Sequence, residues 1–185
     1  MAKVILTGHT SPVGMILNKY LKSKYEVIEI SRKTGYDLRN KLDIDNIIEL
    51  SDNADHFINL ANVGDSQTKL LLGVHNNWES KGKYGKIISF GTFATMIPMQ
   101  TLWNYSADME MISSKLLLEE THKQLQMKQL FGNQPQSILI RFMNYGAKTG
   151  SRASEPYTDE DRMIEMFDFV FNSTSYISTL DFREI

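Results

Sequence analysis

The sequence predicts an α/β fold in which a doubly wound parallel sheet carries helices on both faces, in a single domain. Short apolar stretches alternate with amphipathic stretches of helical spacing, which is typical of βαβ units and a parallel sheet. The apolar stretches at 57–60 (FINL) and 87–90 (IISF) are hydrophobic on both faces over much of their length. That pattern indicates strands covered by helices on both sides of the sheet.

The elements follow each other in a regular order. Strands are predicted at about 2–7, 26–31, 54–60, 84–90, 136–143 and 176–184. Helices are predicted between and after them, at about 13–24, 43–51, 66–79, 104–129 and 159–172. A short strand or turn is expected near Tyr36, Asp37 and Leu38. The length of 185 residues and the absence of a repeat or linker predict one domain over 1–185.

The composition narrows the classes of partner. The net charge is −2, so the chain lacks the excess of basic residues that is typical of proteins that bind nucleic acid or anionic membranes. The chain has no cysteine, which excludes disulfides and thiolate metal sites, and its four histidines lack the spacing of metal ligands. We therefore expect a cytoplasmic protein that acts on a small-molecule substrate and holds no metal ion.

The first fourteen residues carry the clearest functional pattern. An apolar run at 4–6 ends in Thr7 and Gly8, a polar loop follows, and Gly14 opens an amphipathic segment. A strand that enters a helix through such a loop directs free backbone N–H groups and the helix dipole at one point, which favours a phosphate. The loop predicts a dinucleotide site at 8–14, although Pro12 occupies the place of a middle glycine. The alternative is an ordinary strand–turn–helix.

Several segments, in their order and spacing, resemble the short-chain dehydrogenase/reductase family, including its NAD-dependent epimerase/dehydratase branch. Residues 7–14 resemble the T-G-x-x-x-G-x-G loop, Asp37-Leu38 the adenine-contacting pair, and 59–62 the N-A-G or H-L-A-A segment. Residues 85–92 resemble the segment that ends in the catalytic Ser/Thr, 113–120 the S-K-x-x-x-E run, and 138–146 the R-P-x-N-V-Y-G turn. The resemblance implies a Rossmann-like, NAD(P)-binding domain.

The motif matches assign cofactor contacts residue by residue. The predicted cofactor-binding residues are Gly8, Thr10, Ser11, Val13, Gly14, Arg32, Lys33, Asp37, Leu38, Ala61 and Asn62.

The residues after the second strand bear on the choice of cofactor. An acidic residue there would accept a hydrogen bond from the ribose 2′-OH of NAD, whereas a basic residue pairs with the 2′-phosphate of NADP. The chain has Ser31, Arg32 and Lys33 at this point and no carboxylate. We therefore expect NADP(H) to be preferred, with NAD(H) as the second cofactor. The alternative is a solvated basic turn.

The resemblance also implies a catalytic centre, which this chain matches incompletely. Its candidate residues are Thr92, which would orient the substrate oxygen, Tyr105, which would transfer a proton, and Lys115, which would lower the pKa of the tyrosine. The family's Tyr-x-x-x-Lys motif is degenerate, because Met109 takes the lysine position after Tyr105 and Met111 the tyrosine position before Lys115. Ten residues separate Tyr105 from Lys115 (115 − 105), about 15 Å along a straight helix.

Two functions from different classes follow. The first is an NAD(P)(H)-dependent oxidoreductase or sugar-nucleotide-modifying enzyme that acts on a carbonyl or hydroxyl group. The second is a catalytically impaired NADP(H)-binding protein with a regulatory or scaffold role. The resemblance further implies a homodimer through the helix near 104–129.

Overall fold

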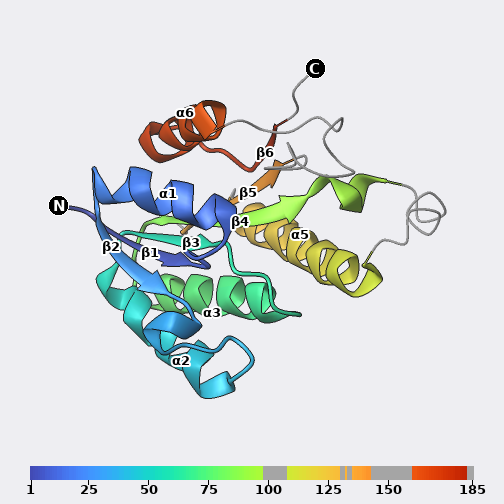
Figure 1. Ribbon diagram of the computed structural model, residues 1–185, viewed down its shortest axis with the longest axis horizontal. Coiled ribbons are helices and arrows are strands. Elements are labelled where there is room, and N and C mark those ends of the chain that lie inside the picture. The colour runs from blue at the N-terminus through green and yellow to red at the C-terminus, as the bar shows by residue number, and fades with distance from the viewer. Residues whose placement is uncertain (98–107, 130–131, 133–134, 143–159, 183–185) are drawn as a thin grey trace.

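The computed structural model describes residues 1–97, 108–129, 132, 135–142 and 160–182 of the chain. One sheet of six parallel strands forms its centre (Figure 1), in the order β2-β1-β3-β4-β5-β6. The strands are β1 (Lys3–Thr7), β2 (Glu26–Ile30), β3 (His56–Asn59), β4 (Lys86–Thr92), β5 (Gln136–Phe142) and β6 (Thr179–Phe182). The predicted doubly wound parallel sheet is confirmed.

The order of the strands creates a switch point. From β1 the chain crosses to β2 on one side, and then returns past β1 to β3 on the other side. The carboxyl ends of β1 and β3 are aligned, because Thr7 pairs with Asn59. Loops that leave the two strands in opposite directions open a crevice between them, which is where open α/β sheets bind ligands.

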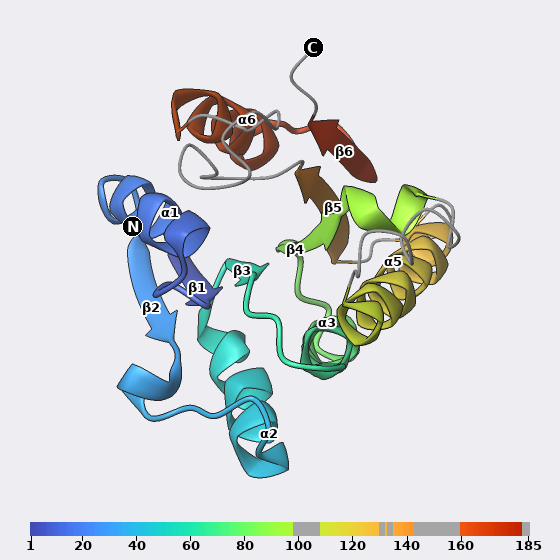
Figure 2. The ribbon, with the colours of Figure 1, turned by 45° about the vertical axis from the view of Figure 1, so that its right-hand side comes forward.

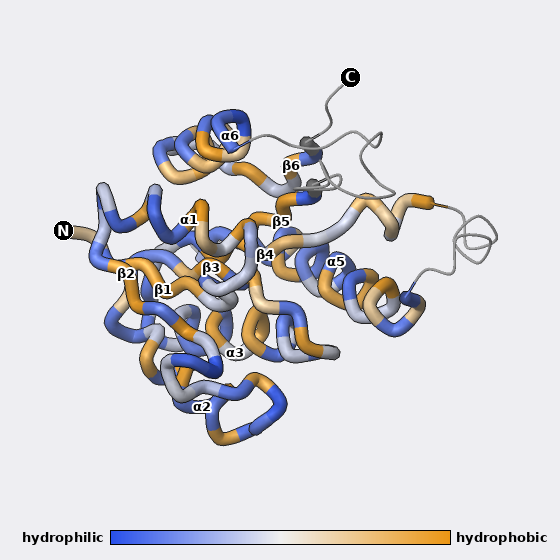
Figure 3. Tube along the Cα trace, in the orientation of Figure 1, coloured by the Kyte–Doolittle hydropathy of each residue, from blue (hydrophilic) through white to orange (hydrophobic). Residues whose placement is uncertain are grey.

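Helices cover both faces, as predicted (Figure 2). On one face lie α1 (Pro12–Lys22) and α6 (Glu160–Asn172), which contact each other. On the other lie α2 (Lys41–Leu50), α3 (Ser66–Ser80) and α5 (Met109–Gln129). Hydrophobic residues of the helices and strands gather toward the sheet (Figure 3), so that the strands are buried between two apolar layers.

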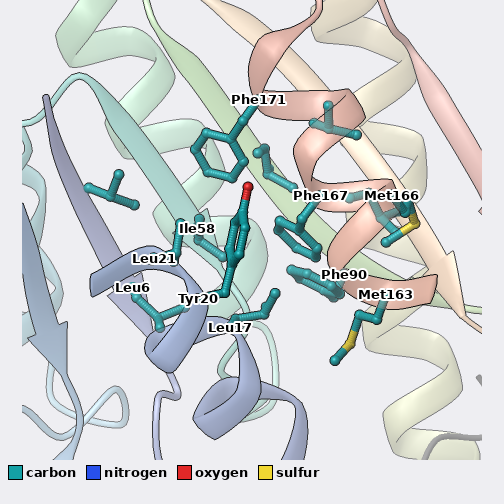
Figure 4. Packing of buried hydrophobic residues seen from close by; sticks show 14 of the residues in the cluster. Leu6, Leu17, Tyr20, Leu21, Ile58, Phe90, Met163, Met166, Phe167 and Phe171 are labelled. Atoms are coloured by element: carbon teal, nitrogen blue, oxygen red, sulfur yellow. The ribbon is translucent and has the colours of Figure 1, made fainter. Parts of the chain in front are cut away.

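The layer under α1 and α6 is rich in aromatic side chains (Figure 4). Phe90 of β4 stacks on Phe167 of α6 with ring centroids 5.6 Å apart, and Phe167 also contacts Phe171. Tyr20 and Leu17 of α1 complete this layer. On the opposite face Trp78 is fully buried, and its indole N–H donates to the Ser51 carbonyl at 3.1 Å.

Side chains also define where helices begin and end. Ser11 caps α1 by accepting a hydrogen bond from the Gly14 N–H, and Pro12 occupies the first turn, where its missing N–H costs nothing. At the far end of α6 the Lys86 ammonium donates to the carbonyls of Val170, Phe171 and Ser173 at 2.7–2.8 Å. These contacts hold α6 against β4.

Several predicted boundaries differ from those of the structure by two residues or more. The helix expected at 104–129 begins at Met109. The Asp108 carboxylate caps this helix by accepting a hydrogen bond from the Met111 N–H at 3.0 Å. Residues 104–107 lie outside the described part. The last strand begins at Thr179 rather than near 176, and β4 continues to Thr92 rather than ending at 90. The short segment at 36–38 forms a turn, so the sheet ends at β2.

Within the described residues, no helix is both long enough and apolar enough to cross a membrane.

The pH dependence of the stability should depend on His56, whose ring packs against the rings of Tyr25 and Phe171. Burial, and secondarily the charge of Lys86, lowers the pKa of His56 to about 4. The unfolded chain takes up this proton near pH 6.5 and the folded chain does not, so stability falls as the pH falls from about 6.5 to about 4.

From pH 7 to pH 5, the unfolding free energy of the wild type should fall by about 2 kcal/mol more than that of His56→Phe. Urea unfolding at the two pH values measures this. The variant should keep part of the dependence, because His75 and His122 are also buried with lowered pKa values. Parallel curves for the two proteins would contradict the role given to His56.

Candidate functional site

The loop between β1 and α1 is shaped by two glycines. Gly8 has a φ of +74°, in the left-handed region that favours glycine, and a Cβ there would lie 2.9 Å from the Ala61 nitrogen. Gly14 is more restricted, because a Cβ there would lie 2.1 Å from the Gly8 carbonyl oxygen. The first turn of α1 therefore packs directly on the loop that precedes it.

The hydroxyl of Ser11 is used inside this loop. It donates to the Gly8 carbonyl and accepts from the Gly14 N–H, both at 3.0 Å. The Ser11 hydroxyl therefore holds the loop, and contact between Ser11 and a cofactor stays a prediction. The Val13 N–H, in the first turn of α1, lacks an acceptor within the helix and remains available to an anion.

A cleft of about 400 Å³ opens over this loop at the switch point. Nine of the eleven predicted cofactor residues line it: Gly8, Thr10, Ser11, Arg32, Lys33, Asp37, Leu38, Ala61 and Asn62. Val13 and Gly14 do not; Val13 packs against the apolar layer under α1, and Gly14 is buried against Gly8. The structure thus brings most of the predicted set together, while what they bind stays a prediction.

Sequence reasoning missed five residues of the cleft. They are Ile30, Ser31, Tyr36, Arg39 and Val63, which all lie within two residues of a predicted residue in the chain. The available signal was position alone, since parallel strands end at one edge of the sheet and the residues after each strand meet there.

The charged rim of the cleft lies on the short 3-10 helix η1 (Arg32–Thr34). Ser31 caps this turn at one end, and Gly35 closes it with a φ of +92°. The side chains of Arg32 and Lys33 are exposed and make no ion pair within the described part of the chain. Asp37 is turned to its own backbone, because its carboxylate accepts from the Arg39 N–H at 3.0 Å.

These groups fit a phosphorylated dinucleotide. Gly8 brings the backbone close to the cleft, and α1 points its N-terminus, with the positive end of its dipole, at the loop. Arg32 and Lys33 add two cations that form no ion pair with any described residue. The donors and the charge match an anionic ligand, and Leu38, Ala61 and Val63 supply an apolar wall for a flat base.

The candidate catalytic residues are arranged differently. Lys115 is 6% exposed, and its ammonium donates to the Gln67 side-chain carbonyl at 2.5 Å and to the Phe90 carbonyl at 2.7 Å. Burial lowers the pKa of Lys115 to about 8, and the Glu119 carboxylate one turn later opposes that shift. Lys115 does not line the cleft. Gln67, which sequence reasoning did not identify, is therefore the partner that holds it.

Thr92 lies at the end of β4, beside a buried ion network. Its hydroxyl oxygen accepts from the Ala94 N–H at 3.3 Å, and its carbonyl accepts from Thr95 at 2.7 Å. Thr95 also reaches Glu119, which forms a two-bond ion pair with Arg141 at 2.9 and 3.0 Å. The network joins β4, β5 and α5 and fixes the segment that carries Thr92.

The position of the predicted proton donor is not settled by these contacts. Tyr105 lies outside the described residues, so its distance to Lys115 stays a prediction. Met111 lines a polar hollow of about 240 Å³ together with Asn62, Asp108, Glu110 and Ser114. Since Asn62 also lines the cleft, the hollow adjoins the predicted cofactor site at the first turn of α5.

Comparison with solved structures supports the fold. A short-chain dehydrogenase from Leptospira borgpetersenii with bound NAD+ is 17% identical, with a TM-score of 0.75 over 98% of this chain and 91% of that chain. The chain has the Rossmann-like fold of short-chain dehydrogenases. A short-chain dehydrogenase from Burkholderia cenocepacia in complex with NADP is 15% identical, with a TM-score of 0.73 over 98% of this chain and 96% of the other.

The same fold recurs in an alcohol dehydrogenase from the archaeon Thermococcus sibiricus, complexed with 5-hydroxy-NADP. It is 11% identical, with a TM-score of 0.71 over 100% of this chain and 97% of that chain. No protein-family model matches the sequence, and no curated protein matches it significantly. The predicted likeness to the short-chain dehydrogenase fold is therefore confirmed by structure rather than by sequence.

The packing of the β1–α1 loop gives a testable consequence. Gly14→Ala should destabilise the protein by about 3 kcal/mol, because the new methyl group meets the Gly8 carbonyl, which belongs to the backbone. Gly35→Ala is the control: its φ is +92° but the space around it is open, so only backbone strain of about 1 kcal/mol is expected. Urea unfolding measures both. Equal losses would contradict the close approach of residues 8 and 14.

Proposed function

We propose that the protein binds NADP(H), and NAD(H) more weakly, and is an NAD(P)(H)-dependent oxidoreductase that acts on a carbonyl or hydroxyl group of a small molecule. The observation that carries the proposal is the cleft at the switch point, which combines the glycine loop, the start of α1 and the unpaired Arg32 and Lys33. The cofactors named for the structural neighbours, NAD+ and NADP, support it.

In this proposal each part of the cleft has a separate role. The pyrophosphate is held by backbone N–H groups at the start of α1 and at His9 and Thr10, because those of Gly8 and Ser11 already donate to the Ile30 and Gly8 carbonyls. Leu38, Ala61 and Val63 contact the adenine, and Arg32 pairs with the 2′-phosphate. The bound nicotinamide supplies hydride transfer, and Thr92 orients the substrate oxygen, since its hydroxyl proton has no acceptor among the described residues.

Arg32→Ala tests the cofactor part. The affinity for NADPH should fall about ten- to a hundredfold, the effect of one charge-assisted hydrogen bond, because only NADP(H) carries the 2′-phosphate. The affinity for NADH should change less than about threefold. Calorimetric titration of both cofactors measures this, with Arg39→Ala as a matched arginine control on the same cleft. Equal losses for NADPH and NADH would show that Arg32 does not bind the 2′-phosphate.

The reaction within this class stays open between carbonyl reduction and sugar-nucleotide modification. Either needs a group that transfers a proton, and Tyr105 is the proposed one, supported by its place 13 residues after Thr92 (105 − 92). Met109 removes the lysine that would lower the pKa of Tyr105, so activity should be low at neutral pH and rise in alkali.

The second candidate is an NADP(H)-binding protein without turnover. Two observations favour it: Met111 lines the hollow beside the cleft, and Lys115 is held in the protein interior by Gln67 and Phe90. A methionine cannot exchange protons, and a buried lysine with two carbonyl acceptors is fully explained by its structural role.

Substitution at residues 105 and 111 separates the two candidates. If the protein is an enzyme, Tyr105→Phe should abolish NADPH oxidation with a panel of aldehydes, ketones and nucleotide sugars, while NADPH still binds. Met111→Tyr, which places a phenol four residues before Lys115, should raise the rate at neutral pH. No oxidation by the wild type with any of these substrates, together with tight NADPH binding, would favour the second candidate.

A homodimer through α5 also stays a proposal. It is supported by Leu116 and Leu117, which are 42% and 50% exposed on the outer side of that helix.

A further inference from the structure

Two histidines are buried in the contact between α3 and α5, which lie side by side (Figure 2). His75 of α3 is 0% exposed and His122 of α5 is 1% exposed. A hydrogen bond of 2.5 Å joins the His122 Nδ1 atom to the Ser137 hydroxyl of β5. The Nε2 atom of His122 and both ring nitrogens of His75 have no hydrogen-bond partner within the described residues. Buried polar atoms without a partner are costly, so this point of the contact is weaker than the apolar packing around it.

Both imidazoles are uncharged in this contact at pH 7. Burial, and secondarily the charge of His75, lowers the pKa of His122 to about 3. Burial also lowers the pKa of His75; the Glu79 carboxylate opposes this shift and the Lys128 ammonium of α5 adds to it. The Glu79 oxygen is 3.8 Å from the His75 Nδ1 atom, which is too far for a hydrogen bond.

The charged groups that precede His122 on α5 already have partners. Glu119, one turn earlier, forms an ion pair with Arg141 of β5. Lys115, two turns earlier, donates to the side-chain carbonyl of Gln67. A proton on His122 would therefore meet no free carboxylate among these groups, and it would repel a proton on His75.

The contact between Lys115 and Gln67 joins the same two helices nearer to their starts. Lys115 precedes His122 by seven residues (122 − 115) and Gln67 precedes His75 by eight (75 − 67). Either spacing is about two turns of an α-helix. Leu71 of α3, between the two positions, is fully buried in the same apolar cluster as α5. A movement that separates the helices at the histidines would therefore also act on the contact between Lys115 and Gln67.

We propose that His75 and His122 form an acid-sensitive switch: when both take up a proton, α5 separates from α3 and Lys115 is released from Gln67. Two like charges in a buried contact repel each other, and each is stable only where water reaches it. The opening belongs to the protein alone and needs no cofactor. Its effect on a reaction rests on the proposed function, because Lys115 is one of the candidate catalytic residues.

The two states of His122 set the size of the effect. The ring takes up a proton near pH 6.5 when the contact is open, and near pH 3 when it is closed. Lowering the pH from 7 to 5 should therefore shift the equilibrium toward the open state about 25-fold through His122. His75 adds a factor of at most about 25-fold, the limit for a ring that takes up no proton in the closed state.

Hydrogen exchange of the α5 amides tests the switch. In the wild type, the opening constant over residues 112–122, corrected for the intrinsic exchange rate, should rise at least about 25-fold from pH 7 to pH 5. His122→Asn, whose amide group can keep the bond to Ser137, should remove about 25-fold of this rise. His75→Phe, which replaces the two nitrogens without partners by carbon, should also reduce it.

His56→Phe is the matched control, because His56 is also buried with a lowered pKa but packs against Phe171 on the other face of the sheet. It should leave the rise in α5 unchanged. The wild type gives a test that needs no variant: at pH 5 the opening constant of α5 should exceed that of the central strand β1. Equal constants, or an equal loss of the rise in His56→Phe, would mean that α5 opens only by global unfolding and would refute the switch.

The remaining outcomes separate the parts of the inference. A rise confined to residues 122–129 would show that the opening does not reach Lys115, and the proposed release would be wrong. An unchanged rise in both His75→Phe and His122→Asn would refute the role of the histidines. NADPH titration of the wild type at pH 7 is independent of these results, so its failure would refute the proposed function and leave the switch standing.

Discussion

The close approach of the β1–α1 loop to the loop after β3 is the constraint on which the candidate site depends. Thr7 is fully buried, and its hydroxyl oxygen accepts from the N–H groups of Leu60 and Ala61 at 3.0 and 3.1 Å. At position 8 there is no room for a side chain, because a Cβ would collide with the backbone of Ala61. These contacts fix the two loops at the switch point, and with them the floor of the cleft and the direction of α1.

The two halves of the site differ in how their polar groups are used. In the cofactor half, Arg32 and Lys33 have charges that no described residue neutralises, so binding an anion there costs no internal interaction. In the catalytic half, Lys115 and Glu119 are already satisfied, by Gln67 and Phe90 and by Arg141. Using Lys115 on a substrate would leave the buried Gln67 side-chain carbonyl without its donor. This asymmetry explains why cofactor binding is the stronger part of the proposal.

The buried polar groups also connect function to stability. The ion network of Glu119, Arg141 and Asp181 ties β5 and β6 to α5, and removal of one partner would leave a charge in the interior. The Arg141 pKa is raised above its usual value by its hydrogen bonds to Glu119. The segment after β4 that carries Thr92 is therefore positioned by groups that lie behind it in the fold.

The six strands, the helices between them and the positions of most cleft residues follow from local patterns of the chain. Alternation of apolar runs and the glycines at 8 and 14 are local properties, and parallel strands bring the residues after them to one edge. The start of α5 at Met109 was missed because the helical pattern of the sequence continues before it. The start is set by the cap that Asp108 provides.

The hydrogen bonds of individual side chains, in contrast, depend on how the folded chain packs. The Ser11 hydroxyl is turned into its own loop, and the Lys115 ammonium is turned toward Gln67. Each outcome depends on partners that are distant in the chain or on the geometry of one turn. Spacing along the sequence predicts which residues lie near the site. The hydrogen bonds and burial of their side chains depend on the neighbours that they meet in the folded protein.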